Sequence, residues 1–214
     1  MKIMIMGPMN SGKGTYASRI AQKMGIPHIS TGQIFRENIA AKTELGKKVE
    51  SFINKGFLVP DDITVKVARE RISKHDCKNG FIFDGFPRSI EQAKQFDKIS
   101  KFDMVIFLDV PKEVLIERTS GRKTCKKCGE IFNMATFPPK KEGICDKCGG
   151  ELFQREDETP EGIKKRLEEY ERNTKPLIDY YKKQGVLKRI IFENPRAPPE
   201  ENTIFLLKAI GVKK

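Results

Sequence analysis

Short apolar runs alternate with stretches of helical spacing along the chain. Two of the runs end in Asp, and each is continuous rather than interleaved with polar residues. Continuous runs of this length suit strands that are buried on both faces, as in a parallel sheet. Strands that alternate with helices predict an α/β fold with a central parallel sheet. The expected strands are 2–6, 81–84, 104–109 and 186–192, and the expected helices are 15–23, 89–95 and 204–210.

Two stretches interrupt this alternation. Residues 30–60 contain helical pieces but no strand pattern, and residues 118–157 concentrate four Cys, five Gly and a Pro-Pro pair. Because neither stretch continues the rhythm of strands and helices, we interpret both as insertions into one core. The expected division is a core of 1–29, 60–121 and 160–214, with insertions at 30–59 and 122–159.

A long helix is predicted after the second insertion. Thr159 suits an N-cap and Pro160 suits the first helical position. Pro176 should kink or interrupt this helix, because proline lacks the N–H of a helical hydrogen bond. One apolar face is marked by Ile163, Leu167, Tyr170 and Leu177.

Composition narrows the classes of protein. The chain has 214 residues, which is enough to bury a core without disulfides. Lys and Arg total 41 against 29 Asp and Glu, a net charge of +12, and this favours an anionic partner: nucleic acid, anionic lipid or phosphorylated small molecules. The longest apolar run, Met104 to Leu108, has five residues, whereas a membrane span needs roughly 20. With no signal-peptide pattern at the N-terminus, we expect a cytoplasmic protein without a membrane partner.

The segment 7–15, Gly-Pro-Met-Asn-Ser-Gly-Lys-Gly-Thr, lies between the first predicted strand and the first predicted helix. This is the context of a phosphate-binding loop, whose backbone N–H groups surround phosphate oxygens while Lys13 adds a positive charge. The common pattern places Ser or Thr directly after the Lys. Here Gly14 intervenes, so Thr15 is the candidate for the magnesium side. A glycine-rich turn without a ligand is the alternative interpretation.

Two Asp residues that end predicted strands, Asp84 and Asp109, are candidates for holding Mg²⁺ directly or through water. Asp84 is favoured because Gly-Phe-Pro-Arg follows it at 85–88 and has the composition of a loop that faces a ligand. The segment 54–57, Asn-Lys-Gly-Phe, lacks the Asp of the guanine-binding motif Asn-Lys-x-Asp. This absence argues against the usual type of GTPase.

Four cysteines form two Cys-x-x-Cys pairs that are sixteen residues apart, and each pair is followed by Gly. This spacing predicts a zinc site, and four thiolates leave no open position on the metal, so the site would be structural. Iron in place of zinc stays open, as do unrelated thiols. Cys77 is left over and is expected to be a free thiol. The predicted ligands are Cys125, Cys128, Cys145 and Cys148.

The lysines around these cysteines support a rival function, since zinc ribbons often bind nucleic acid. A basic ribbon inserted into a phosphate-loop protein, with an Arg on either side, is better placed to cover nucleotide phosphates. We therefore interpret it as a lid whose closure expels water from the site. The lysines in question are Lys123, Lys126, Lys127, Lys140, Lys141 and Lys147.

Further motifs occur together in a fixed order along the whole chain. They are the loop ending at 12–15, Ser-Thr-Gly at 30–32 with Arg36, Asp-Gly-Phe-Pro-Arg at 84–88 with Gln92, Glu117-Arg118 with Gly121-Arg122, Arg155-Glu156-Asp157, and Lys165-Arg166-Leu167 before 176–181. In these motifs the sequence resembles the adenylate kinase family, in its long-lid, zinc-binding form. The resemblance implies a phosphate-loop core, an AMP-binding insertion at 30–59 and a lid at 122–159.

The resemblance also implies roles for single residues. The ATP site would consist of Gly7, Asn10, Ser11, Gly12, Lys13, Gly14, Thr15, Arg118 and Arg122. The AMP site would consist of Thr31, Gly32, Arg36, Gly56, Phe57, Leu58, Val59, Gly85, Arg88, Gln92, Arg155 and Arg166. The phosphoryl group in transit would contact the catalytic residues Lys13, Arg88, Arg122, Arg155 and Arg166. Magnesium would be held through water by Thr15 and Asp84.

The implied reaction is Mg·ATP + AMP ⇌ 2 ADP, with ATP, AMP and ADP as partners of a monomer. A phosphate monoester is already an anionic nucleophile, so the reaction needs positioning and charge neutralisation rather than a general base. The chain has only two His and no hydrolase-like triad, in agreement with that chemistry. A kinase of another nucleoside monophosphate, a GTP:AMP phosphotransferase and a zinc-ribbon protein that binds nucleic acid remain alternatives.

Two positions depart from the family pattern. Asn10 stands where the family usually has its second loop glycine. Asp157-Glu158 stands where the family has an Asp-Asp pair after the lid. The first departure is expected to tune the loop, and the second weakens any inference about hinge contacts.

Overall fold

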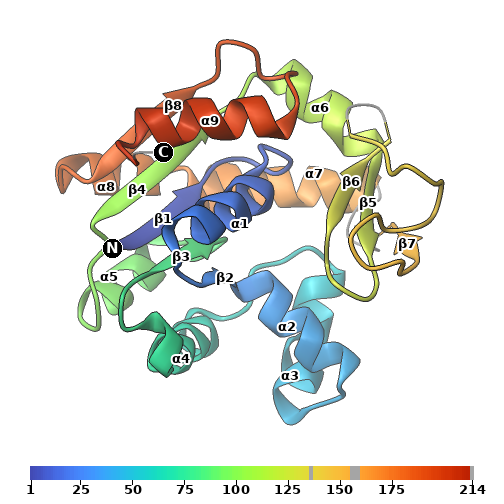
Figure 1. The fold of residues 1–214 in the computed structure, drawn as a ribbon. Coiled ribbons are helices and arrows are strands. Elements are labelled where there is room, and N and C mark those ends of the chain that lie inside the picture. Colours follow the sequence, from blue (N-terminus) through green and yellow to red (C-terminus); the bar gives the residue numbers. More distant parts are fainter. Residues whose placement is uncertain (135–136, 155–159, 213–214) are drawn as a thin grey trace.

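The computed structural model describes residues 1–134, 137–154 and 160–212. Its centre is a five-stranded parallel sheet in the order β2-β3-β1-β4-β8 (Figure 1). The predicted α/β fold with a central parallel sheet is therefore confirmed. The strands are β1 (Lys2–Met6), β2 (His28–Ser30), β3 (Phe81–Asp84), β4 (Met104–Asp109) and β8 (Leu187–Ile191).

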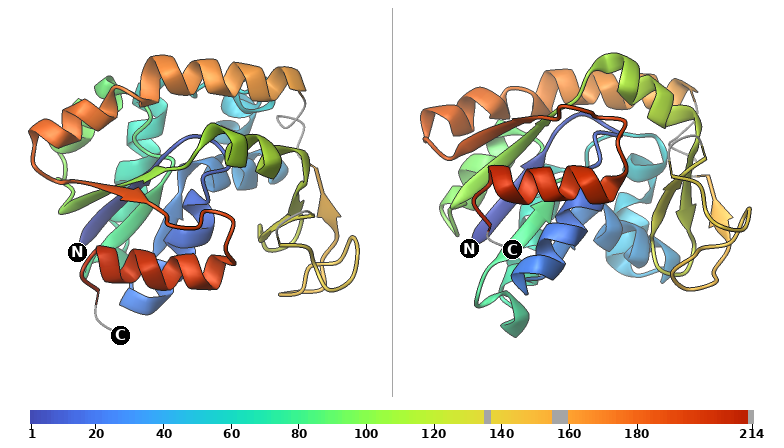
Figure 2. Two further views of the ribbon diagram at one scale, coloured as in Figure 1. Left: turned by 90° about the horizontal axis from the view of Figure 1, so that it is seen from above. Right: turned by 45° about the horizontal axis from the view of Figure 1, so that its top comes forward.

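Helices cover both faces of this sheet. Side chains alternate along β1, so that Ile3 and Ile5 pack against α1, α6 and α9, while Met4 and Met6 pack against α4, α5 and α8. Figure 2 shows the sheet between these two layers. Both faces are apolar, which is why β1, β3 and β4 are continuous apolar runs in the sequence. The helices are α1 (Lys13–Met24), α4 (Asp61–Ile72), α5 (Ile90–Asp97), α6 (Lys112–Ser120), α7 (Pro160–Glu169), α8 (Leu177–Lys183) and α9 (Pro199–Ala209), with a short 3₁₀ turn η1 (His75–Cys77).

The carboxyl ends of the strands meet at one edge of the sheet. Ile5 pairs with Asp84 across β1 and β3, and Met6 pairs with Phe107 across β1 and β4. The loop after β1 and the loop after β3 therefore start side by side. In parallel α/β sheets this edge is where ligands bind.

The first insertion is a helical hairpin of α2 (Thr31–Ala40) and α3 (Glu44–Asn54) that extends below the sheet in Figure 1. The Ser30 and Thr43 side chains cap the two helices by accepting hydrogen bonds from backbone N–H groups. At the crossing, a Cβ on Gly46 would lie 2.2 Å from the carbonyl oxygen of Asn38. Only glycine allows the helices to approach this closely.

The second insertion is a small antiparallel sheet in the order β6-β5-β7 at the side of the core. Its strands are β5 (Arg122–Cys125), β6 (Ile131–Asn133) and β7 (Leu152–Phe153). Its apolar cluster is small: the buried members are Cys125, Phe132, Cys145 and Leu152. Two of those four are cysteines, so this insertion buries little hydrocarbon of its own.

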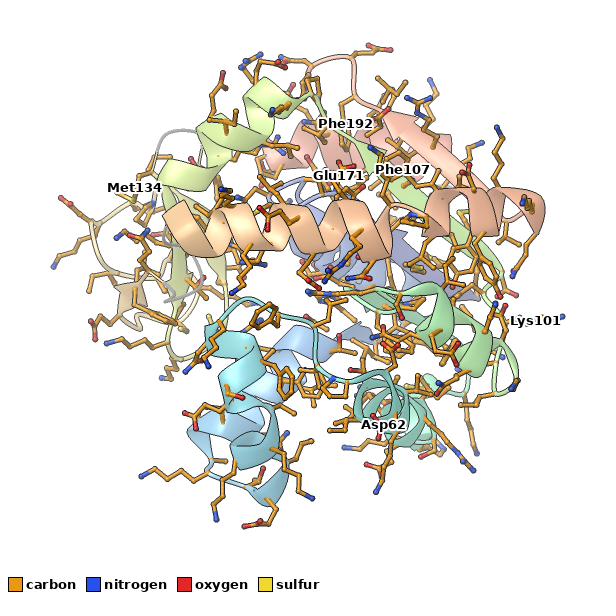
Figure 3. All side chains as sticks on the ribbon, turned by 180° about the vertical axis from the view of Figure 1, so that it is seen from behind. Asp62, Lys101, Phe107, Met134, Glu171 and Phe192 are labelled. Atoms are coloured by element: carbon orange, nitrogen blue, oxygen red, sulfur yellow. The ribbon has the colours of Figure 1, made fainter. Side chains whose placement is uncertain are left out.

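The long helix predicted after the second insertion is interrupted, as expected, near Pro176. Helix α7 begins at Pro160, whereas Thr159 lies outside the described residues. A π-helical turn, η3 (Tyr170–Thr174), separates α7 from α8; Figure 3 shows this helical run from behind, with Glu171 on the turn. The N–H of Lys175 reaches back five residues to the carbonyl of Tyr170. A proline that lacks an N–H and crowds the preceding turn explains the break.

The sequence prediction lacked β2, α4, η1 and α6 of the core and the strands β5, β6 and β7 of the second insertion, and α9 starts at Pro199 rather than at residue 204. Strand β2 has three residues, which is too short to show periodicity. Helices α4 and α6 carry many charged residues beside few buried apolar ones. Within the part of the chain that the structure describes, no helix is both long enough and apolar enough to traverse a membrane.

Candidate active site

A cavity of about 540 Å³ opens at the carboxyl edge of the sheet, between the two insertions. Most of the residues predicted for the nucleotide sites line it. Those are Gly7, Asn10, Gly12, Lys13, Gly14, Thr15, Gly32, Arg36, Gly56, Leu58, Asp84, Gly85, Arg88, Arg118, Arg122 and Arg166. Ser11, Thr31, Phe57, Val59 and Gln92 are not among the lining residues. Arg155 lies outside the described residues.

The loop between β1 and α1 surrounds the Lys13 ammonium. Nζ of Lys13 donates to the carbonyl oxygens of Gly7 and Pro8, at 2.9 and 2.7 Å. Gly12 precedes α1 with φ 93°, and a Cβ there would lie 2.6 Å from the Tyr16 ring. Gly12, the N-cap residue of α1, has no side chain that could cap the helix. The N–H groups at the start of an α-helix suit an anion, and Gly12 to Thr15 line the cavity.

The charges around Lys13 affect its protonation. Burial of the ammonium among protein atoms lowers the pKa of Lys13 to about 7; the carboxylate of Asp84 opposes this shift, and Arg88, Arg166 and Arg122 add to it. Arg88, Arg166 and Arg122 therefore lie close enough to Lys13 to disfavour its positive charge, and such a cluster of cations suits an anionic ligand. A bound phosphate group would restore the ammonium form.

Asp84 lies against the same loop. A Cβ on Gly14 would be 3.2 Å from Oδ2 of Asp84, so glycine at this position lets the carboxylate approach the start of α1. Burial alone would raise the pKa of Asp84, but His28, Lys13 and Arg88 together hold it below its ordinary value. An ionised carboxylate beside Thr15 at a phosphate loop is a fitting donor set for Mg²⁺ held through water.

The segment after β3 directs Arg88 into the cavity. Gly85 has φ 75°, and a Cβ on it would lie 2.9 Å from Nη2 of Arg88. Arg88 Nε donates to the carbonyl of Gly85 at 2.9 Å, and Oγ1 of Thr31 donates to the same carbonyl at 3.1 Å. A cis peptide bond joins Phe86 to Pro87 in this turn.

Gln92 supports this segment from α5. Its Oε1 accepts from the backbone N–H of Arg88 at 2.7 Å, and its Nε2 donates to Oδ1 of Asp61 at 2.8 Å. The residue is 1% exposed. The role on adenine that the resemblance implies for Gln92 stays a prediction, whereas its contacts here fix the backbone of Arg88. Asp61 gave no motif signal in the sequence.

Two arginines at the base of the second insertion contact the phosphate loop. Arg118 Nη1 donates to the backbone carbonyl of Asn10 at 3.3 Å, and Arg118 Nη2 donates to the carbonyl of Pro195. Arg122 Nη1 donates to Oδ1 of Asn10 at 3.0 Å. A glycine, which is usual for the family at position 10, has no side-chain oxygen for this contact. Asn10 therefore ties the loop to the base of the insertion.

The four predicted metal ligands converge in the second insertion. All four Sγ atoms lie within 4.8 Å of one another, with Cys125 and Cys148 at 3.5 Å and Cys128 and Cys145 at 3.6 Å. Ligands at about 2.3 Å from a tetrahedral zinc ion lie roughly 3.8 Å apart. The donor set and its spacing therefore fit such an ion. Cys77 lies elsewhere, buried beside Arg71 and Asp76.

The cavity also has lining residues that the motifs did not identify. His28, Glu169, Tyr170 and Thr174 all line it. The last three stand at the end of α7 and on the π turn. Proline at 176 was the only sequence signal for an irregularity there, and it did not indicate which side chains would turn inward.

As a whole, the described wall carries arginines from several parts of the chain around Lys13 and Asp84, and Glu37, Glu130 and Glu169 also line it. Arg36 and Arg88 approach from the side of the first insertion, Arg118 and Arg122 from the second, and Arg166 from α7. Guanidinium groups bind phosphate oxygens in pairs of hydrogen bonds. The arrangement can hold phosphate chains that enter from two sides.

Comparison with known proteins agrees with this geometry. The profile of the adenylate kinase family matches residues 5–186. An adenylate kinase of Caldicellulosiruptor bescii is 48% identical over 218 aligned residues, covering 100% of both chains. One from Thermosipho africanus is 50% identical over 192 residues, covering 87% of this chain and 90% of its own, and one from Clostridium tetani is 47% identical over 207 residues, covering 91% and 96%. Since both the profile and full-length relatives match, the chain belongs to the adenylate kinase family.

Proposed function

We propose that the cavity holds Mg·ATP and AMP end to end, with the phosphate loop on the donor side and the segment of Arg88 on the acceptor side. As a member of its family, the chain transfers the terminal phosphoryl group of ATP to AMP reversibly and forms two ADP. The observation that carries our assignment is the ring of arginines around Lys13 and Asp84 in one cavity.

On the donor side, the N–H groups of 7–15 and the Lys13 ammonium bind the β- and γ-phosphates of ATP. Arg118 and Arg122, which already contact Asn10 of this loop, lie over its outer side. Thr15 and Asp84 would hold Mg²⁺ through water. The ion would supply positive charge to the ATP phosphates.

On the acceptor side, Arg36 and Arg88 bind the AMP phosphate. Both are held by local contacts: Arg36 Nη2 donates to Oε1 of Gln33 and Arg88 Nε donates to the carbonyl of Gly85. Gly56 and Leu58 line the cavity near the hairpin and suit the nucleoside. Thr31, Phe57, Val59 and Gln92 also belong to the proposed AMP site, although they are not among the lining residues.

The transfer step follows from these positions. An oxygen of the AMP phosphate attacks the γ-phosphorus of ATP while the bond to the β-γ bridging oxygen breaks. Because the nucleophile is already an anion, no side chain has to remove a proton. Arg88, Arg122 and Arg166 neutralise the charge that spreads over the transferred group, and Lys13 stabilises the leaving ADP.

We further propose that 30–59 and 122–159 are the AMP-binding and lid parts of the enzyme around one core. An apolar cluster confined to 122–159 supports the second division, whereas the cluster of the first insertion also includes Ile63 and Val67 of α4. Zinc on the four cysteines would staple the lid, which buries little hydrocarbon.

A panel of donors and acceptors tests the function. Purified protein is given Mg·ATP or Mg·GTP with AMP, UMP, CMP or dTMP, and nucleotide products are separated by chromatography. We expect ADP formation with Mg·ATP and AMP above all other pairs. A preference for GTP or for another monophosphate would replace the substrate assignment, and oligonucleotide binding without turnover would support the nucleic-acid alternative. Metal analysis of the same sample tests zinc against iron.

A further inference from the structure

We propose that Thr174 is a positioning residue for Arg88, and that its hydroxyl fixes the backbone of this arginine for the AMP phosphate. Oγ1 of Thr174 donates to the carbonyl oxygen of Arg88 at 2.9 Å, across 86 positions of sequence. Thr174 is 8% exposed and lies on the wall of the cavity. The inference rests on the proposed function, because it assigns Arg88 to AMP.

The π turn explains why Thr174 reaches this carbonyl. Its wider turn, closed by the hydrogen bond from Lys175 N–H to the carbonyl of Tyr170, changes the direction of side chains relative to a continuous α-helix. Thr174 then shares one buried face with Leu177 and Tyr181 of α8, in keeping with their helical spacing. That face is directed at the core, where the segment after β3 lies.

With this contact, side chains from two elements hold the backbone of Arg88. Gln92 of α5 accepts from its N–H, and Thr174 of η3 donates to its C=O. Helix α5 starts with Ser89 as its N-cap, so the carbonyl of Arg88 precedes the helix and takes no part in its ladder of hydrogen bonds. Both polar groups of this peptide backbone are thus directed by side chains.

The same helical run also carries Arg166, about two turns before Thr174. The hydrogen bond of Thr174 therefore connects the helical run that carries Arg166 to the backbone of Arg88. Loss of the hydroxyl should misplace Arg88 relative to Arg166. The expected consequence is weaker AMP binding and slower transfer, with little change on the ATP side.

The test compares three substitutions at one position. Thr174→Val removes the hydroxyl and keeps the shape, Thr174→Ser keeps the hydroxyl, and Thr174→Cys keeps the size with a weak donor. Steady-state kinetics with AMP and with Mg·ATP varied separately are combined with calorimetric Kd values for each nucleotide alone. We expect Thr174→Val to raise KM and Kd for AMP on the order of tenfold, since one hydrogen bond is lost, with KM for ATP within about twofold.

The Ser variant should restore values near those of the wild type, and the Cys variant should be intermediate. Thr203→Val is the matched control, because Thr203 is equally buried at 8% and its Oγ1 donates to the carbonyl of Pro199 in α9. That variant should lose stability without a change in the ratio of the two KM values. Circular dichroism and thermal melting establish that each variant is folded.

Several results would overturn the proposal. One is an unchanged Kd for AMP in folded Thr174→Val. A second is an equal loss of affinity for AMP and for ATP in that variant. A third is a Thr174→Ser variant that binds AMP as weakly as Thr174→Val. If the Val variant does not fold, the comparison of the Cys and Ser variants decides by the same criteria. A wild-type protein that makes no ADP from AMP would refute the proposed function instead, and it would do so before any variant is measured.

Discussion

The protonation of Lys13 gives a prediction that links nucleotide binding to pH. In the nucleotide-free protein, burial and the charges of Arg88, Arg166 and Arg122 lower the pKa of Lys13 to about 7. The phosphates of ATP would place several negative charges beside the ammonium and raise this pKa again. Binding should therefore take up a proton whenever Lys13 is neutral beforehand.

The magnitude follows from the pKa. The pKa of Lys13 is about 7 in the free protein. The number of protons taken up for each ATP bound is therefore about 0.1 at pH 6, about 0.5 at pH 7 and about 0.9 at pH 8. Because the ammonium form of Lys13 binds ATP, the affinity for ATP is highest below about pH 7 and falls as the pH rises through that value. Each further pH unit should weaken binding about tenfold until the pKa of the complex is reached.

Titration calorimetry measures this uptake directly. Mg·ATP is titrated into the protein at pH 6, 7 and 8, in buffers that differ in ionisation enthalpy, and the slope of the heat against that enthalpy is the number of protons bound. Lys13→Met is the matched control: it cannot titrate at this position, yet the nucleotide's own protonation is the same. The uptake attributed to Lys13 is the difference between the two proteins.

Two outcomes would contradict the reasoning. Equal proton uptake by wild type and Lys13→Met at pH 8 would show that Lys13 is already charged in the free protein. An ATP affinity that is constant from pH 6 to pH 9 would show the same. In either case burial of the ammonium would be compensated by its two carbonyl contacts and Asp84.

Four further substitutions test the site and the fold. Arg88→Ala should raise KM for AMP by about 10- to 100-fold, because hydrogen bonds to a charged partner are lost, with a much smaller effect on KM for ATP; equal effects in steady-state kinetics would contradict the site assignment. Cys128→Ser should lower the metal content and Tm, while kcat at low temperature changes little. Cys77→Ser is the control and should leave the metal content unchanged. A metal-free protein of normal stability would contradict the zinc proposal. Gly12→Ala should reduce the free energy of unfolding by about 1–3 kcal/mol, because φ is 93° and the Tyr16 ring must move; urea unfolding within about 0.5 kcal/mol of wild type would refute this.

Local patterns account for the parts that the sequence predicted well. Strands β1, β3 and β4 are buried on both faces, so their apolar runs are uninterrupted and easy to recognise. The phosphate loop and the two Cys-x-x-Cys pairs are short segments whose chemistry depends on neighbours in sequence. Spacing alone was enough to predict the cysteine cluster, in which Cys125 and Cys148 are 3.5 Å apart.

Elements without a local pattern were not predicted. Strand β2 is three residues long, and helix α6 has a weakly segregated mixture of charged and apolar residues. The interruption near Pro176 was expected, but its form as a π turn was not. Whether the chain bends, breaks or widens at such a proline depends on the packing of Leu177 and Tyr181 against the core, which the sequence does not display.

Residue patterns in the sequence by themselves predicted the fold class, the phosphate loop and the metal-binding cysteines, whereas the choice of arginines came from the resemblance to the family. The tertiary structure alone decided how these groups act on one another. The pKa of Lys13 depends on arginines from three distant segments. The backbone of Arg88 is held by Gln92 and by Thr174, and neither burial nor a hydrogen bond across 86 residues exists until the parallel strands bring their carboxyl ends together.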